Sequence, residues 1–97
     1  MNIPMVSERM DEVHVIFKHA LQRNGKDRPF TEATVEWIGR NGKDRVHKGV
    51  ARVHPNDAPE RRIGRKVALA RALWDAGFTR DERRQVWMGL MEKGMRV

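Results

Sequence analysis

Arginine and lysine side chains are concentrated in the last third of this sequence. Residues 61–97 contain ten Lys and Arg against four Asp and Glu, whereas residues 1–60 contain ten against nine. Guanidinium groups pair with phosphate or carboxylate oxygens in a bidentate geometry. The composition therefore predicts a surface that binds an anionic partner. The predicted binding residues are Arg61, Arg62, Arg65, Lys66, Arg71, Arg80, Arg83 and Arg84.

The spacing of these cations supports the prediction. On the helix expected here, Arg61, Arg65 and Arg71 lie away from the core face. Ala68 and Ala72 fall between them, and such small side chains leave the backbone open to phosphate. The cations that open the next helix oppose its macrodipole, which indicates a partner anion, and we expect the whole set to lie on one exposed side. The alternative is that Arg and Ala are simply good helix formers on a solvated face.

A hexapeptide with the sequence Arg-Asn-Gly-Lys-Asp-Arg occurs twice, at residues 23–28 and 40–45. Asn-Gly favours type I′ turns, so each copy is expected to close a β-hairpin. The hairpin tips would then carry a second basic set, which consists of Lys26, Arg28, Lys43 and Arg45. The alternative is that one turn sequence is used twice and that the charges beside it are only solvated.

The residue types needed for catalysis or metal binding are sparse. Among the four histidines, no pair has metal-ligand spacing on a helix face, and there is no cysteine. No Ser/His/Asp or Cys/His arrangement can be identified. We therefore expect no catalytic residue, no metal and no cofactor, and we predict that the protein is not an enzyme. Without cysteine or an apolar run of membrane-helix length, a cytoplasmic protein with no membrane contact is expected.

The strands are expected in the first half of the chain. Residues 13–17, 33–38 and 46–53 are rich in β-branched and aromatic residues or alternate in polarity. They are expected to pair through the two hairpin turns. The segment 8–22 is open to a second interpretation, because its apolar residues also share one face of a helix. The strand interpretation is preferred.

Two helices are expected in the second half. The first begins near Asp57, which is a good N-cap, and ends at Gly77 in the left-handed conformation. The second begins with a capping box formed by Thr79 and Glu82. The predicted core faces are Ile63, Val67, Ala70, Leu73 and Trp74 on the first helix, and Val86, Trp87, Leu90 and Met91 on the second.

These elements predict an α+β fold, in which a small antiparallel β-meander of two or three strands packs against a C-terminal αα-hairpin. All 97 residues are expected to form a single domain. It is mainly β over residues 1–54, with a helix as the alternative near its start, and a helical hairpin over residues 55–97. Trp37, Trp74 and Trp87 are expected to meet between the layers. A core this thin is also compatible with a homodimer.

Three stretches of the second half carry a resemblance to a known group of proteins. They are His54–Asp57, Gly64–Leu73 and Phe78–Trp87, and the segment that they define covers about half of the chain. This segment resembles small proteins encoded by tailed phages and prophages. The resemblance implies a phage setting, and so the host cytoplasm, and it implies no assigned activity and no catalytic residues. Small phage proteins commonly bind and modulate a host protein, such as a polymerase, a nuclease or a CRISPR effector.

These observations lead to two predicted functions. The first is a non-enzymatic accessory protein of phage type, which binds DNA or RNA through the arginine-rich helical face with phosphate contacts and little base reading. The alternative is a phage-encoded inhibitor or modulator, similar to an anti-CRISPR protein. It would use the same face against an acidic host protein surface.

Overall fold

The computed structural model describes residues 1–23, 27–52 and 61–95, with the side chains of residues 21–28 left aside. Six elements follow one another along the chain. They are β1 (Asn2–Pro4), β2 (Glu12–Arg23), β3 (Asp27–Ile38), β4 (Asp44–Arg52), α1 (Arg61–Asp75) and α2 (Arg80–Glu92). The predicted N-cap Asp57 and the predicted tip residue Lys26 lie outside the described residues.

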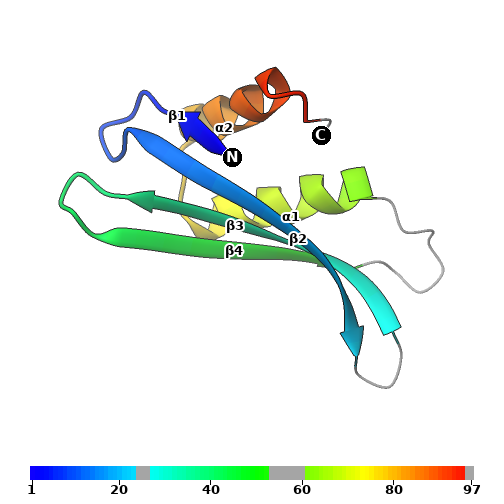
Figure 1. The fold of residues 1–97 in the computed structure, drawn as a ribbon. Helices are drawn as coiled ribbons and strands as arrows, with labels where there is room; N and C mark the ends of the chain where they lie inside the picture. The colour runs from blue at the N-terminus through cyan, green and yellow to red at the C-terminus, as the bar shows by residue number, and fades with distance from the viewer. Residues whose placement is uncertain (24–26, 53–60, 96–97) are drawn as a thin grey trace.

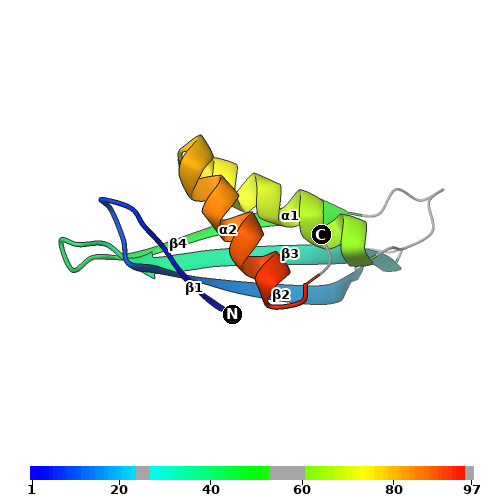
Figure 2. The same cartoon turned by 90° about the horizontal axis from the view of Figure 1, so that it is seen from above.

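The four strands form one antiparallel meander in the order β1-β2-β3-β4. Helix α1 lies across β3 and β4, whereas α2 lies against β1 (Figures 1 and 2). The predicted α+β class is confirmed, but the sheet has four strands instead of two or three. The strand that sequence patterns missed is β1, whose three residues are too few to show an alternating pattern.

The segment with two interpretations is a strand. β2 pairs with β3 over His14–Arg23 and with β1 over Glu12–His14, so ladder hydrogen bonds and not helical ones engage its backbone. Val13 and Val15 are buried, while Ile16 and Lys18 are exposed, as the two-residue period of a strand requires. The helical spacing of the apolar residues in this segment is therefore coincidental.

Both predicted hairpins form, although the described turn is not of the predicted type. At the β3–β4 turn, the backbone N–H of Gly42 donates to the carbonyl of Gly39 at 2.8 Å. Gly42 has a φ of 81°, while no residue other than glycine has a positive φ within the described ranges. Asn41 is therefore not left-handed, which excludes type I′. Arg40 and Asn41 occupy a turn that a left-handed glycine completes.

Helix α1 packs almost directly on the backbone of β4. A Cβ atom at Gly49 would lie 2.1 Å from the carbonyl oxygen of Ala68 and 2.4 Å from the backbone nitrogen of Ala72. Only small helical residues permit so close an approach. The buried face of α1 consists of Ala68, Leu69, Ala72 and Leu73.

This contact overturns the core face predicted for α1. Of the predicted residues, Leu73 is fully buried, but Ile63 is 56% exposed and Trp74 is 77% exposed. The helix is rotated so that its alanines, and not its larger residues, meet the sheet. On α2, Val86 and Leu90 are buried as predicted, whereas Met91 is exposed.

The three tryptophans do not meet between the layers. Trp37 is buried, with its ring stacked on His47 at a centroid distance of 5.4 Å and tilted against Phe78 at 4.9 Å. Trp87 is half-buried at the margin of the core. Trp74 lies on the solvent side of α1, because the close approach at Gly49 leaves no room for an indole beneath the helix.

Candidate nucleic-acid interface

The strongest local concentration of positive charge is at the start of α1. Four cations lie within six consecutive positions. We call them the basic cluster, and they are Arg61, Arg62, Arg65 and Lys66. The first turn of this helix contains no acidic residue, so the positive end of the helix dipole adds to the side-chain charges. Arg65 is half-buried, while the other three are exposed.

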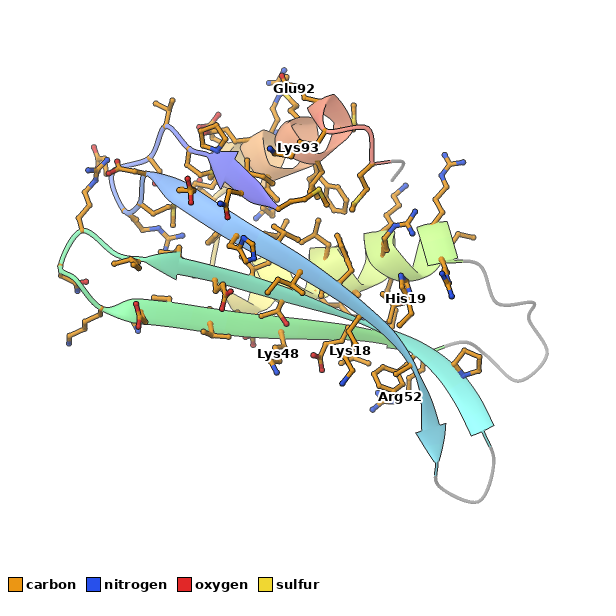
Figure 3. The ribbon with its side chains drawn as sticks, viewed as in Figure 1. Lys18, His19, Lys48, Arg52, Glu92 and Lys93 are labelled. Carbon is orange, nitrogen blue, oxygen red and sulfur yellow. The ribbon has the colours of Figure 1, made fainter. Side chains whose placement is uncertain are left out.

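His19 locates two of these guanidinium groups relative to the sheet. It lies on the helix-facing side of β2, where its Nδ1 is 2.9 Å from the hydroxyl of Thr31 (Figure 3). Burial lowers the pKa of His19 below 6.5, and the charges of Arg61 and Arg65 lower it further. The basic cluster therefore faces a neutral imidazole at neutral pH, and His19 adds no charge to it.

Among the described residues, no carboxylate forms an ion pair with an exposed member of the basic cluster. Within the described residues, the ion pairs are Arg9–Glu82, Arg40–Asp11, His47–Asp75 and Lys48–Glu32. Helix α1 has five cations and one carboxylate, Asp75, which is engaged with His47 at 2.8 Å. Within the described part of the chain, the three exposed cations of the cluster therefore have no carboxylate partner.

Arg71 stands apart from the basic cluster on another side of α1. Its Nη1 donates to the carbonyl of Val50 at 2.6 Å, at the edge of the sheet formed by β4. The alanines expected to expose the backbone beside it, Ala68 and Ala72, are fully buried against the sheet. The predicted face of alternating arginine and alanine is therefore wrong, because both alanines serve helix–sheet packing.

The cations of α2 form a separate group. Helix α1 has 15 residues and is therefore about 22 Å long, and α2 begins near its far end (Figure 2). Arg83 donates to the carbonyl of Phe78 at 2.8 Å and lies 5.9 Å from the Trp74 ring centroid. Arg80 and Arg84 are exposed. The predicted single surface is thus divided between the two ends of the helical layer.

The described hairpin tip does not add a uniform basic surface. Lys43 and Arg45 are exposed at the β3–β4 turn. Asp44 lies between them, and Arg40 is paired with Asp11 at 2.6 Å, so both signs of charge are present. In the other hairpin, Arg28 is opposite Gln22 in the β2–β3 register, and its side chain lies outside the described part.

A family comparison covers the basic cluster. The model of the Rv2632c-like family matches residues 20–78, which is more than half of the chain. The chain belongs to the Rv2632c-like family. The match includes β3, β4 and α1 and ends before α2, so the basic cluster lies inside it and the α2 cations lie outside. The searches of curated proteins and of solved structures each found no match.

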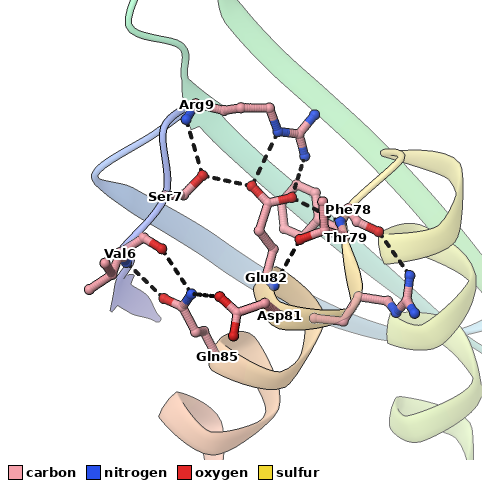
Figure 4. A network of polar contacts seen from close by, with 9 residues as sticks. Val6, Ser7, Arg9, Phe78, Thr79, Asp81, Glu82 and Gln85 are labelled. Carbon is pink, nitrogen blue, oxygen red and sulfur yellow. Dashed lines mark hydrogen bonds and ion pairs between the residues drawn. The ribbon is translucent and has the colours of Figure 1, made fainter.

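The Rv2632c-like chain also contains a polar network around the buried carboxylate of Glu82, which sequence analysis missed (Figure 4). Arg9 donates to both carboxylate oxygens of Glu82, at 2.8 Å and 3.2 Å, and the Ser7 hydroxyl donates at 2.7 Å. The backbone N–H of Thr79 donates at 2.9 Å, which confirms the predicted capping box. This network joins the loop after β1 to α2. No local sequence signal indicates the pairing, because Arg9 and Glu82 are 73 positions apart.

Burial alone would raise the pKa of Glu82. The hydrogen bonds from Arg9, Ser7 and Thr79, together with the charge of Arg9, outweigh burial and lower the pKa to about 2. Glu82 is therefore ionised at neutral pH, and the network neutralises it internally. It holds the fold together and leaves no free anion or cation for a ligand.

The helices and the metal-binding residue types of this Rv2632c-like chain bear on other classes of function. Neither described helix has the length and apolar character needed to cross a bilayer. Across residues 1–23, 27–52 and 61–95, no group of three or more His, Asp or Glu residues is arranged to hold a metal ion.

Proposed function

We propose that this member of the Rv2632c-like family is a non-enzymatic protein that binds the phosphate backbone of DNA or RNA through the basic cluster at the start of α1. The proposal rests on one observation: the first six residues of α1 contain four cations, and its first turn contains no acidic residue. Helix N-termini favour anions, and phosphate contacts supply most of the affinity of sequence-independent binding.

The number of cations sets the expected salt dependence. If the basic cluster neutralises about four phosphates, the logarithm of the association constant falls with the logarithm of the salt concentration at a slope of about −3.6 for duplex DNA. For a single strand the slope is about −2.8. Affinity for a duplex then decreases by about 100-fold between 50 and 200 mM salt.

Two charge-reversal variants test which cations are used. Arg62→Glu with Lys66→Glu removes two cluster contacts, while Arg80→Glu with Arg84→Glu makes the same change in net charge at the start of α2. Fluorescence anisotropy with a labelled oligonucleotide measures the affinity, and circular dichroism checks the fold of each variant. We expect the first variant to weaken binding by about tenfold or more and to halve the salt slope. Equal losses in both variants, or a slope near zero in the wild type, would overturn the proposal.

A second candidate function is the binding of an acidic host protein by a phage-encoded inhibitor or modulator. The observation that favours it is Trp74, which is 77% exposed, because exposed tryptophans are enriched at protein interfaces. The resemblance of the second half to phage proteins supports a phage origin, and the absence of cysteine supports a site of action in the reducing cytoplasm of the host.

A further inference from the structure

Helix α1 has a second apolar face that the described part of the protein leaves largely exposed. Four residues separated by four, three and four positions lie along it: Ile63, Val67, Ala70 and Trp74. At about 3.6 residues per turn, this spacing places all four on one side, which we name the outer stripe. Ile63, Ala70 and Trp74 are exposed, and Val67 is half-buried at the margin of the core.

The outer stripe lies opposite the face that packs on the sheet. Successive helical residues are rotated by about 100°, so Ala68 and Ala72 point toward the sheet while Ala70 and Trp74 point away from it. A helix on a protein surface ordinarily presents polar residues on that side. Single exposed apolar residues are common, but this stripe runs for about 16 Å and ends in an indole. Such a surface is typical of protein-binding sites.

The charges that border the outer stripe determine what can cover it. Arg62 and Lys66 lie along one border and Arg71 lies along the other, by the same rotation. Arg83 adds a cation 5.9 Å from the Trp74 ring centroid. The only carboxylate of α1 is Asp75, which is paired with His47. A second copy of the chain would bring like charges together, whereas an acidic partner would give these cations carboxylates to bind.

A shallow hollow beside Trp74 indicates where a partner side chain would be seated. It lies between α1 and β4, and its lining includes Gly49, Ala70, Arg71 and Trp74. Ala70 leaves space beside the indole because its side chain is small. Arg71 has guanidinium N–H groups besides the one that donates to Val50, so it can also donate to a carboxylate of the partner.

We infer that the outer stripe is the docking site for an amphipathic α-helix of a partner protein, whose apolar face is bordered by Asp and Glu. Two helices that pack along their apolar faces bury residues spaced three and four positions apart, as on the outer stripe. The inference rests on the second candidate function, protein binding. It shares Arg62 and Lys66 with the basic cluster, but it does not require nucleic-acid binding.

A pair of synthetic peptides of about 18 residues, long enough to form helix on contact, serves as the probe. One has leucines along a single helical face with glutamates beside them. The other has the same composition, with the leucines distributed around the helix. Titration calorimetry at physiological salt measures both dissociation constants. We expect the amphipathic peptide to bind more tightly by about tenfold or more, because only its apolar face can cover the outer stripe.

Variants of the protein locate the binding site. Ile63→Ser with Trp74→Ser removes both large side chains of the outer stripe and should weaken the amphipathic peptide by about tenfold or more. Met88→Ser with Met91→Ser is the matched control, since both methionines are exposed on α2. The control should bind as the wild type does. Circular dichroism and thermal unfolding check that each variant keeps its fold.

Three results would overturn the inference. Equal affinity for the two peptides means that charge alone attracts them. Concentration-dependent dimers of the wild type that Ile63→Ser with Trp74→Ser abolishes identify a second copy as the occupant. Competition by a single-stranded oligonucleotide that depends on Trp74 identifies the outer stripe as a base-stacking surface. Failure of the nucleic-acid proposal is seen in a different assay, the fluorescence anisotropy of the labelled oligonucleotide. It appears there as a salt slope near zero, or as equal losses in the two charge-reversal variants.

Discussion

Replacing Glu82 by glutamine tests the buried network that joins the loop after β1 to α2. Glutamine keeps the size of the side chain and one carbonyl oxygen, but it loses the charge that Arg9 neutralises. If the amide nitrogen takes the place of Oε2, the Nε–H of Arg9 loses its acceptor and the Ser7 hydroxyl must change from donor to acceptor. Glu82 is only 5% exposed, so water cannot replace the lost partners.

The pKa of Glu82 sets the size and the pH range of the effect. Lowering the pKa from 4.5 to about 2 corresponds to about 3 kcal/mol of unfolding free energy. Arg9 is partly exposed, and solvent screening reduces the expected value to about 2 to 3 kcal/mol. Because the pKa is depressed in the folded state, this stabilisation is complete above about pH 4.5 and is lost as the pH falls toward 2.

Urea unfolding at pH 7, 5 and 3, followed by circular dichroism, measures the effect. We expect Glu82→Gln to lose about 2 to 3 kcal/mol at pH 7, and we expect the difference from the wild type to narrow as the pH falls. Glu92→Gln, at the exposed end of α2, is the control and should lose little. A loss of less than about 0.5 kcal/mol at pH 7, or a difference that stays constant down to pH 3, would refute the reasoning.

Two further predictions concern α1 and its neighbours. Gly49→Val places a side chain against the backbone of Ala68 and Ala72, so it should lower the unfolding free energy by about 3 kcal/mol or more in urea unfolding. Gly42→Ala, which strains a positive φ but meets no atom within 4 Å, should cost only about 1 to 2 kcal/mol; equal costs would argue against the close helix–sheet contact. The pKa of His19, followed by NMR of its ring protons, should lie below 6.5 because of burial and the charges of Arg61 and Arg65. The pKa should rise when both arginines are replaced by glutamine, and an unchanged titration in this variant would place the two guanidinium groups elsewhere. The stabilisation due to neutral His19 should be lost as the pH falls below 6.5.

Local sequence signals predicted much of the fold. The capping box at Thr79 and the left-handed Gly77 mark the connection between the helices as expected. Both hairpins also form where the repeated hexapeptide occurs. These features depend on residues within a few positions of one another, so sequence patterns can identify them. The predicted type of the β3–β4 turn was wrong, because Asn-Gly accommodates more than one turn geometry.

The orientation of α1 could not be predicted from its own sequence. Apolar residues lie on two faces of the helix, and the face with the larger residues was predicted to pack in the core. Gly49 decides otherwise, because its missing side chain lets Ala68 and Ala72 approach β4. That contact depends on a residue of another element, about 20 positions earlier in the chain. Periodicity within the helix identified one apolar face, but it could not show that the face with Ala68 and Ala72 packs on the sheet.

The candidate interface was predictable in composition and not in arrangement. Charge counts identified every cation of the basic cluster, since clustering along one helix is visible in the sequence. The uses of Arg71 and Arg83 were not visible, because their acceptors are backbone carbonyls of β4 and of the turn before α2. Backbone acceptors have no side-chain signature, so sequence patterns cannot separate such arginines from those that face a ligand.

The hydrogen bond from Arg71 to Val50 also affects how the protein behaves at high concentration. β4 is the last strand of the sheet, and an uncovered last strand can recruit the strands of other molecules and start fibril growth. A guanidinium group bonded to one of its carbonyls blocks part of that template. Lys48 and Arg52 lie at alternate positions of the same strand (Figure 3), and Lys48 is paired with Glu32 of β3. A cation first predicted to bind a ligand thus occupies an acceptor on the last strand of the sheet.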